Sequence, residues 1–266
     1  MSSLREAEPG AGPPPRISVS WIVEETLSFY REKFAALFTI FLLFSLAAWA
    51  AQSYAGVAVK GIMADYNVSI SEIAENPEQM APLILQMAVR IFAVGIALAV
   101  VLWVLYLFAY GSTVRYTYDT YIAGETSWYD SFSRVVPLLP KLFAATLVAL
   151  VIVSLGLIIF VVPGIVLLVM FCLVPQAILI EGTGVIEALG RSGRITSGNK
   201  ITIFLFLLFW VVLGMLVNFA VGSLVGPRWV PTASLIVNAI LGPVIPISTT
   251  IIYKALTGQE ERPALL

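Results

Sequence analysis

The chain has 266 residues, of which 59% are hydrophobic and 12% are charged, with a mean hydropathy of +0.95 and a net charge of −1. Soluble domains carry roughly 25% charged residues, so this composition argues against a soluble globular protein. The net charge hides an asymmetry between alternate loops and says nothing about nucleic acid, and we expect no nucleic-acid partner. The chain contains no histidine, which excludes His-based acid–base catalysis, Ser-His triads and His-liganded metals. We therefore expect no enzymatic activity, no cofactor and no metal site.

The N-terminal segment 1–17 is polar and rich in proline. Glu6 and Glu8 lie where a signal peptide would need an apolar core, so the first hydrophobic segment is expected to remain as a membrane span. The composition predicts a disordered tail over 1–17.

Five segments without Asp, Glu, Lys or Arg follow, over 34–59, 91–114, 142–180, 201–227 and 229–253. About 20 apolar residues cross the hydrocarbon core of a bilayer, so four segments are single spans. The 39-residue segment is long enough for two spans, with the fold between them predicted at Pro163 and Gly164. The prediction is an all-α polytopic bundle of six transmembrane helices, forming one membrane domain over 18–256 with a short tail over 257–266.

The basic residues are distributed unequally between the two sides of the predicted spans. Twelve lie on the side of both termini, against Lys60, Arg90 and Arg228 on the other side. The positive-inside rule therefore predicts a multi-pass protein of the cell membrane with both termini in the cytoplasm. The external loop 60–90 carries a capping-box pattern at Ser69 and a glycosylation sequon at Asn67, whose use depends on the organism. Arg90 is expected at the outer interface, because the apolar run beyond it is long enough to span alone.

Short amphipathic segments over 20–34, 127–142 and 184–201 precede the first, third and fifth spans. In the first, Val23, Leu27 and Tyr30 fall on one helical face. The other two repeat an acid-to-arginine spacing of four residues, which predicts ion pairs between Asp130 and Arg134 and between Glu187 and Arg191. We expect three interfacial helices on the cytoplasmic side that contact lipids or a protein partner, with candidate binding residues Trp21, Trp128, Arg134, Arg191 and Arg194.

The pattern of interfacial helix, span, outer turn and span occurs three times, which predicts a threefold repeat of helix hairpins. The alternative is that any cytoplasmic loop entering a membrane collects amphipathic residues and a lysine.

The last two spans contain uncharged polar and small residues at four-residue spacing. Asn218 and Asn238 fall at similar depths and are predicted to hydrogen-bond, with glycines allowing close helix contact. The alternative is a polar pocket for a headgroup or solute, because prolines free backbone carbonyls nearby. The residues of this predicted intramembrane polar cluster are Asn218, Asn238, Gly242, Pro243 and Pro246.

Pro175 and Gln176 lie near the cytoplasmic end of the fourth span. We expect a helix kink there, with Gln176 bonding freed backbone or facing a partner helix.

Several of these residues occur in a familiar order in the second half of the chain. Pro163 and Gly164 open a span, Pro175 and Glu181 follow, and the sequence Ala-Leu-Gly-Arg-Ser over 188–192 comes next. This order resembles the membrane domain attached to some glycerophosphodiester phosphodiesterases, and related stand-alone six-helix membrane proteins of unknown activity. The resemblance implies a membrane fold over about 164–253, and no active site, because the catalytic domain of those enzymes is absent here.

Two functional hypotheses follow from the sequence. The first is a non-enzymatic membrane protein that organises lipids or a protein partner at the cytoplasmic leaflet. The second is a passive carrier or channel for a small or amphiphilic solute, built around Asn218, Asn238 and Pro243. A continuous cavity would favour the carrier, and a packed bundle with basic residues at one end would favour the organiser.

Overall fold

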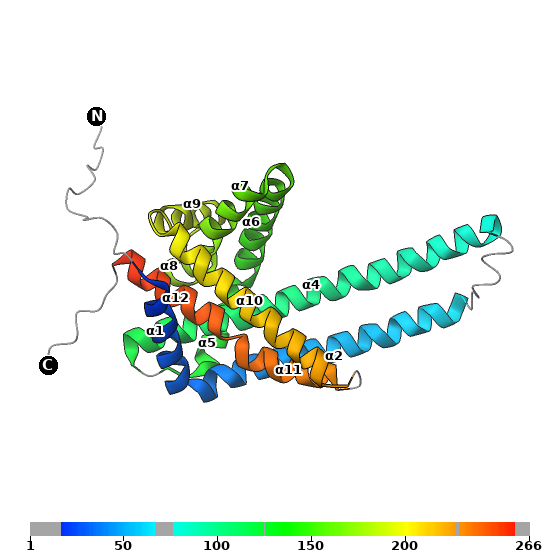
Figure 1. Ribbon diagram of the computed structural model, residues 1–266, viewed down its shortest axis with the longest axis horizontal. Coiled ribbons are helices and arrows are strands. Elements are labelled where there is room, and N and C mark those ends of the chain that lie inside the picture. The colour runs from blue at the N-terminus through cyan, green and yellow to red at the C-terminus, as the bar shows by residue number, and fades with distance from the viewer. Residues whose placement is uncertain (1–16, 67–76, 125, 227–228, 259–266) are drawn as a thin grey trace.

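The computed structural model describes residues 17–66, 77–124, 126–226 and 229–258, and within these residues all regular structure is helical. The predicted sequon at Asn67, the capping box at Ser69 and most of both tails lie outside the described residues. The elements, shown in Figure 1, are α1 Val19–Glu32, α2 Phe34–Tyr66, α4 Pro77–Ala123, α5 Trp128–Val135, the 3₁₀ turn η1 Val136–Leu138, α6 Leu139–Ile159, α7 Val161–Phe171, α8 Val174–Glu181, α9 Val185–Ile195, α10 Lys200–Leu224, α11 Val230–Leu241 and α12 Val244–Thr257.

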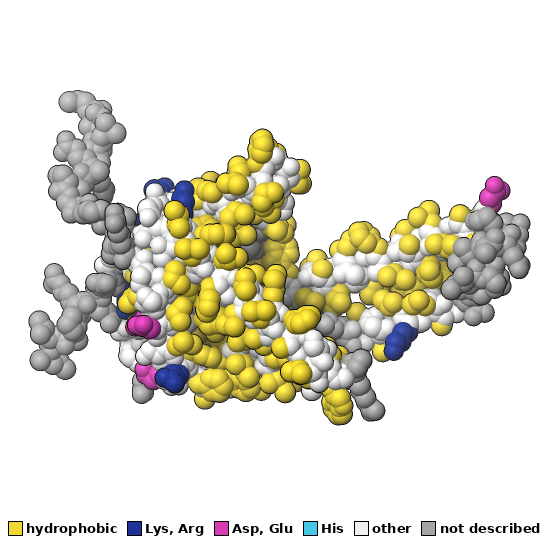
Figure 2. Space-filling model, in the orientation of Figure 1, with side chains coloured by type: hydrophobic (Ala, Val, Ile, Leu, Met, Phe, Trp, Pro, Cys, Tyr) yellow, Lys and Arg dark blue, Asp and Glu magenta, His cyan; other side chains and the backbone are white. Residues whose placement is uncertain are grey.

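Six helices or helix pairs are long and apolar enough to cross a membrane, which confirms the predicted helical membrane bundle. The spans are Phe34–Tyr66, Met80–Ala123, Trp128–Ile159, Val161–Glu181, Lys200–Leu224 and Val230–Thr257. In Figure 2 the middle of the molecule is covered by hydrophobic side chains, and most charged side chains gather at the end that carries α1, α9 and the end of α12. This distribution is the one expected for a bundle solvated by acyl chains.

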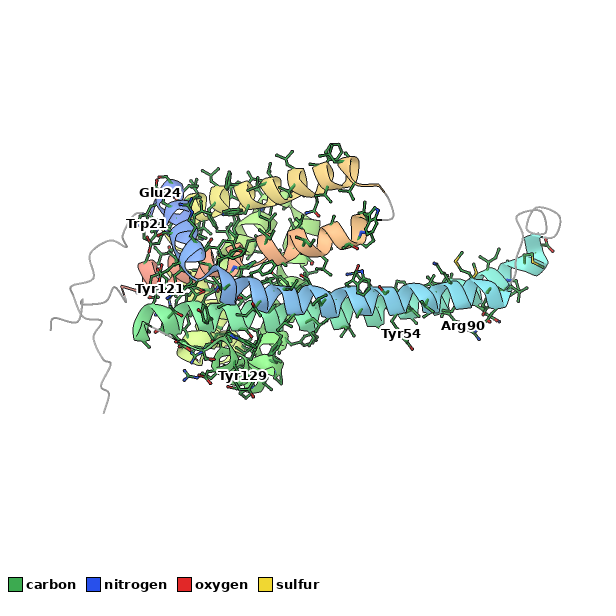
Figure 3. All side chains as sticks on the ribbon, turned by 90° about the horizontal axis from the view of Figure 1, so that it is seen from below. Trp21, Glu24, Tyr54, Arg90, Tyr121 and Tyr129 are labelled. Atoms are coloured by element: carbon green, nitrogen blue, oxygen red, sulfur yellow. The ribbon has the colours of Figure 1, made fainter. Side chains whose placement is uncertain are left out.

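The first hairpin, α2 with α4, extends as an arm well beyond the others (Figures 1 and 3). Its two helices have 33 and 47 residues, against the 20 or so that a bilayer requires. Arg90 lies on this arm, with its guanidinium carbon 5.5 Å from the centre of the Tyr66 ring. The aromatic face of Tyr66 gives Arg90 a cation–π partner between the two helices of the arm.

The 39-residue apolar run folds at Phe160, three residues before the predicted position. Phe160 is extended (φ −152°, ψ 133°) and ends α6, while Pro163 falls in the first turn of α7. Proline is tolerated there because its missing N–H has no partner in a first turn. Gly164 marks the closest approach of the two helices, since a Cβ atom would lie 2.6 Å from the backbone nitrogen of Leu157.

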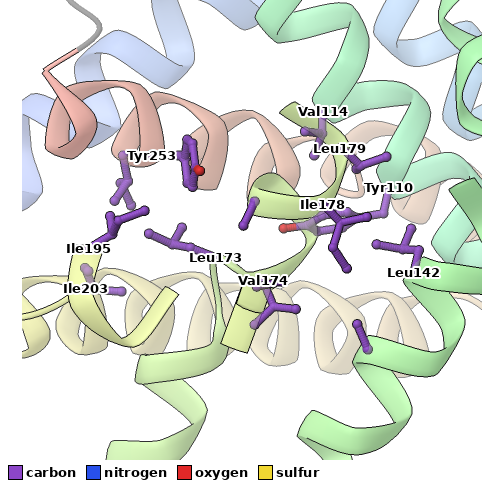
Figure 4. Close-up of a cluster of buried hydrophobic side chains, with 14 of the residues drawn as sticks. Tyr110, Val114, Leu142, Leu173, Val174, Ile178, Leu179, Ile195, Ile203 and Tyr253 are labelled. Carbon is purple, nitrogen blue, oxygen red and sulfur yellow. The ribbon is translucent and has the colours of Figure 1, made fainter. Parts of the chain in front are cut away.

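The core lies where the second, fourth and sixth spans meet. Figure 4 shows this cluster, in which α4 contributes Tyr110 and Val114, α8 contributes Ile178 and α12 contributes Tyr253. The sixth span is the most buried of the six, and α12 is buried along nearly its whole length. Residues of the third and fifth spans join this cluster, with Leu142 from α6 and Ile203 and Phe206 from α10.

Helices occupy the three segments predicted to be interfacial, as α1, α5 and α9, which together are called the collar below. Each packs against the C-terminal part of an even-numbered span, α5 against α4, α9 against α8 and α1 against α12. Helices α5 and α9 each pack on the span that directly precedes them in the chain. Helix α1 has no preceding span and packs on the last one, so the three pairs of collar helix and span form a closed ring. A ring of this kind is the arrangement that the predicted threefold repeat requires.

Candidate functional site

Helix α1 is fixed to α12 by polar contacts. Ser18 caps its N-terminus by accepting a hydrogen bond from Trp21 N at 3.2 Å. The Thr26 hydroxyl lies 2.9 Å from that of Ser248, and Tyr30 donates to the carbonyl of Ile240 at 2.7 Å. Burial raises the pKa of Tyr30 to about 12, so its hydroxyl remains a donor.

The apolar face predicted from Val23, Leu27 and Tyr30 is only partly the face that packs on the protein, because Tyr30 is buried and Val23 packs against the core. Ile22, Thr26, Phe29 and Tyr30 are buried, whereas Leu27 and Trp21 are exposed. The reason is that Thr26 finds a hydroxyl partner on α12, which turns Leu27 outward into the surrounding medium. Trp21 and Glu24 lie on the outside of α1 in Figure 3, so Trp21 remains available to a lipid or partner.

Helix α5 is held by an ion pair to α4, and the predicted pair between Asp130 and Arg134 is wrong. Arg134 Nη1 lies 3.3 Å from a carboxylate oxygen of Asp119, which also has Arg115 Nη2 at 3.8 Å. Arg134 is therefore occupied in placing α5 on its span. Trp128 packs edge-on against Phe132, which stacks on Phe108 of α4.

Helix α9 shows the same departure from the predicted local pairing. Arg191 Nε and Nη2 bind both carboxylate oxygens of Glu181, at the end of α8, at 2.9 to 3.2 Å. Hydrogen bonding to Glu181 raises the pKa of Arg191 above its ordinary value. Glu187 accepts a hydrogen bond from Gly184 N at 3.3 Å and so caps α9 instead of pairing with Arg191.

A second contact joins α9 to the break between α7 and α8. The helix is interrupted between Phe171 and Val174, and Leu173 leaves helical geometry (φ −102°, ψ 8°) just before Pro175, which confirms the predicted kink. Ser192 donates its hydroxyl to Met170 O at 2.5 Å and accepts from Leu173 N at 3.3 Å. These bonds satisfy backbone groups that a broken helix would otherwise bury without partners. The Ala-Leu-Gly-Arg-Ser sequence thus holds α9 on the kinked span through Arg191 and Ser192.

Gln176 lies at the centre of the bundle and faces partner helices, as predicted. It is fully buried, and its amide donates to the Tyr110 hydroxyl at 2.9 Å and the Thr249 hydroxyl at 2.7 Å. The two hydroxyls are 2.8 Å apart, so the three even-numbered spans each contribute one member of the node. Gln176 Oε1 is buried without a hydrogen-bond partner among the described residues.

The predicted contact between Asn218 and Asn238 is wrong. Both side chains are exposed, and the Asn218 amide donates to Gly214 O of its own helix at 2.9 Å. A Cβ atom at Gly214, Gly222 or Gly226 would meet nothing within 4 Å, so these glycines do not line a close contact within the chain. Only the other end of the cluster is packed, where Gly242 lies against Phe41 and Pro243 and Pro246 are buried.

We therefore expect Asn218→Leu combined with Asn238→Leu to leave thermal stability nearly unchanged. Exposed substitutions away from special features typically change stability by about 0.5 kcal/mol or less. The unfolding temperature of the purified double variant in detergent measures this. A large loss would mean that the asparagines meet a partner that the isolated chain does not provide.

A cavity of about 360 Å³ lies between α4 and the α6–α7 hairpin. Figure 2 shows the surface hollowed where that hairpin diverges from α4. The size falls within the roughly 300–1,000 Å³ of typical ligand pockets. The walls are almost wholly apolar and aromatic, with a few polar groups toward the central node, and include Trp103, Tyr106, Tyr110, Thr146, Ala149, Leu150, Val153, Leu168, Phe171, Cys172 and Pro175.

A groove on the collar adjoins this cavity. It runs between the end of α7 and the outer side of α9, and Phe171 lines both the groove and the cavity. One end is apolar, with Ile186 74% exposed, and the other carries Arg194 and Ser197. Among the predicted binding residues Arg194 differs from Arg134 and Arg191, because no ion pair within the described residues holds it.

The model of the Uncharacterised protein family (UPF0259) matches residues 16–253, a range that begins before α1 and ends within α12. No curated protein and no solved structure matches the chain significantly. With nearly its whole length matched, the chain belongs to the uncharacterised protein family UPF0259.

Proposed function

We propose that this protein is a non-enzymatic membrane protein that binds and organises lipids at the cytoplasmic leaflet. The observation that carries the proposal is the groove on α9, where an arginine with no ion pair among the described residues and an apolar floor lie beside a cavity in the membrane-spanning region. A groove with an arginine beside an apolar cavity favours an amphiphilic ligand with an anionic head.

The basic residues at the collar end support the cytoplasmic orientation, because the positive-inside rule assigns that end to the inner leaflet. Trp21 and Trp128 add aromatic side chains of the kind that anchor proteins at headgroup level. The resemblance to the membrane domain of glycerophosphodiester phosphodiesterases agrees with a role close to phospholipids, and stays a prediction.

The carrier hypothesis loses its predicted site, since Asn218 and Asn238 face outward. The central node of Gln176, Tyr110 and Thr249 is buried, and the cavity that Tyr110 lines has almost wholly apolar walls, which do not suit a polar solute. We therefore favour lipid binding over transport of a solute.

The proposal predicts selective lipid retention. The protein is reconstituted in vesicles of equal parts phosphatidylglycerol and phosphatidylethanolamine, extracted into mild detergent and analysed by native mass spectrometry. We expect at least one anionic lipid per chain to be retained in excess over the zwitterionic one. Retained lipids that mirror the vesicle mixture would contradict the proposal, and rapid movement of a fluorescent lipid between leaflets would favour a carrier.

A further inference from the structure

Two concavities that meet at one residue suggest a single extended ligand. The groove on α9 and the cavity between α4, α6 and α7 both include Phe171 in their walls. The groove lies at the collar, where charged side chains gather, and the cavity lies among apolar spans. A ligand that fills both must have a polar head and an apolar chain.

Arg194 provides the polar contact of this pair of concavities. Arg134 and Arg191 are engaged with Asp119 and Glu181, whereas Arg194 is exposed and forms no ion pair within the part of the chain that the structure describes. Its guanidinium has five N–H donors in a geometry that matches phosphate oxygens. Ser197 lies beside it in the groove and adds a hydroxyl. The chemistry therefore favours a phosphate group over a neutral head.

Two glycines keep the groove open. Gly190 and Gly193 lie inside helix α9, where each costs about 1 kcal/mol relative to alanine. A Cβ atom at Gly193 would approach Met170 Cε at 3.2 Å, and one at Gly190 would lie 3.6 Å from Arg194 Nη1. Only the first position is tight, so the fold does not require glycine at 190, where a larger side chain would lie beside Arg194 in the groove.

The cavity accepts the apolar part of the ligand. Its lining residues come from α4, α6, α7 and the start of α8 and are mainly aliphatic and aromatic. Leu150 lines its edge and is 52% exposed, so the cavity is reached from the side of the bundle through the hydrocarbon region. An acyl chain can enter there without leaving an apolar environment.

We propose that one anionic phospholipid of the inner leaflet lies across Phe171, with its phosphate on Arg194 in the α9 groove and one acyl chain in the cavity between α4 and the α6–α7 hairpin. This inference rests on the proposed lipid-binding function and assigns its site. The two concavities explain why a phospholipid is favoured over free phosphate, which would leave the cavity unused, and over a hydrocarbon, which would leave Arg194 unused.

The test compares matched variants in the same vesicles of phosphatidylglycerol and phosphatidylethanolamine. Arg194→Gln is compared with Arg31→Gln, which removes the same charge from exposed Arg31 on α1. Leu150→Trp, which narrows the cavity, is compared with Val151→Trp, because Val151 is 50% exposed and does not line it. Gly190→Leu places a larger side chain in the groove, at a position where a Cβ atom makes only ordinary contact. Retained lipid is counted by native mass spectrometry, and immobilised acyl chains are detected with spin-labelled phosphatidylglycerol.

We expect Arg194→Gln to lower selective retention of phosphatidylglycerol by roughly tenfold, as loss of one charge-assisted hydrogen bond implies. Leu150→Trp should reduce the immobilised-chain signal, and Gly190→Leu should reduce retention without lowering the unfolding temperature. Arg31→Gln and Val151→Trp should match the parent protein. Retention that is selective in the parent and unchanged in all three site variants would overturn the site while leaving the proposed function intact. If the parent protein itself retains phosphatidylglycerol and phosphatidylethanolamine equally, the proposed function is contradicted.

Discussion

Replacement of Gly242 by alanine is expected to destabilise the bundle by about 1–3 kcal/mol, the range for overpacking a filled core. A Cβ atom at Gly242 would overlap the ring of Phe41 on α2 and lie 2.5 Å from the carbonyl oxygen of Asn238. Gly242 also adopts helical dihedral angles (φ −54°, ψ −42°) directly before Pro243, a position where a side chain disfavours the α region. The steric overlap and the backbone restriction before proline both destabilise the variant. Neither the Phe41 ring nor the Asn238 carbonyl can move away freely.

The matched control is Gly222→Ala on α10. A Cβ atom there would meet nothing within 4 Å, and alanine has the higher helix propensity. The unfolding temperature in detergent should fall for Gly242→Ala and stay level or rise for Gly222→Ala. Equal values for the two variants would show that α11 and α2 do not pack as described.

Reversal of one charge in the pair between Glu181 and Arg191 is expected to have the second large effect. Glu181→Arg would face Arg191 with a like charge and remove three hydrogen bonds of 2.9 to 3.2 Å. Hydrogen bonds to charged groups typically contribute about 1.5–3 kcal/mol, and the lower part of this range applies because the Arg191 side chain is 35% exposed. We expect α9 to separate from α8 and the unfolding temperature to fall.

The reciprocal variant separates electrostatics from packing. Glu181→Arg combined with Arg191→Glu restores opposite charges and should recover much of the lost stability, which a double-mutant cycle quantifies. Additive losses in the double variant would contradict the role of this ion pair in attaching α9. Arg194→Gln on the same helix should leave stability unchanged, since Arg194 holds no ion pair within the described residues.

The spans and interfacial helices could be predicted because hydrophobic length and helical periodicity are local properties of the sequence. The kink at Pro175 is local in the same way. The predicted turn at Pro163 lies three residues after the observed one at Phe160. The reason is that proline is compatible with a first helical turn as well as with a loop.

Partner choice could not be predicted from spacing alone. Arg134 and Arg191 each have an acidic residue four positions earlier, yet both bind the carboxylate at the end of a neighbouring span. Those carboxylates are more buried than a helix-surface acid, so the pairing there is less screened by water. Asn218 was misplaced for a related reason, because the spacing of polar residues gives their helix face and not which helix covers it.

The sequence could not predict that Arg134 and Arg191 form ion pairs while Arg194 forms none within the described residues. All three lie in amphipathic segments with similar surroundings. Only the positions of Asp119 and Glu181 in three dimensions distinguish the arginine that is available to a ligand from those that hold helices in place.

The predicted location of the collar at the inner leaflet underlies both the proposed function and the assigned lipid site. Single cysteines at Glu24, Ser133 and Glu187, one on each collar helix, and at Asp65 on the arm can be introduced into a Cys172→Ala background, since Cys172 is the chain's one cysteine. A membrane-impermeant maleimide added to intact cells should label only the cysteine at Asp65, and the same reagent added to inverted vesicles should label only the three collar positions. Labelling of the collar positions from outside intact cells would contradict the account.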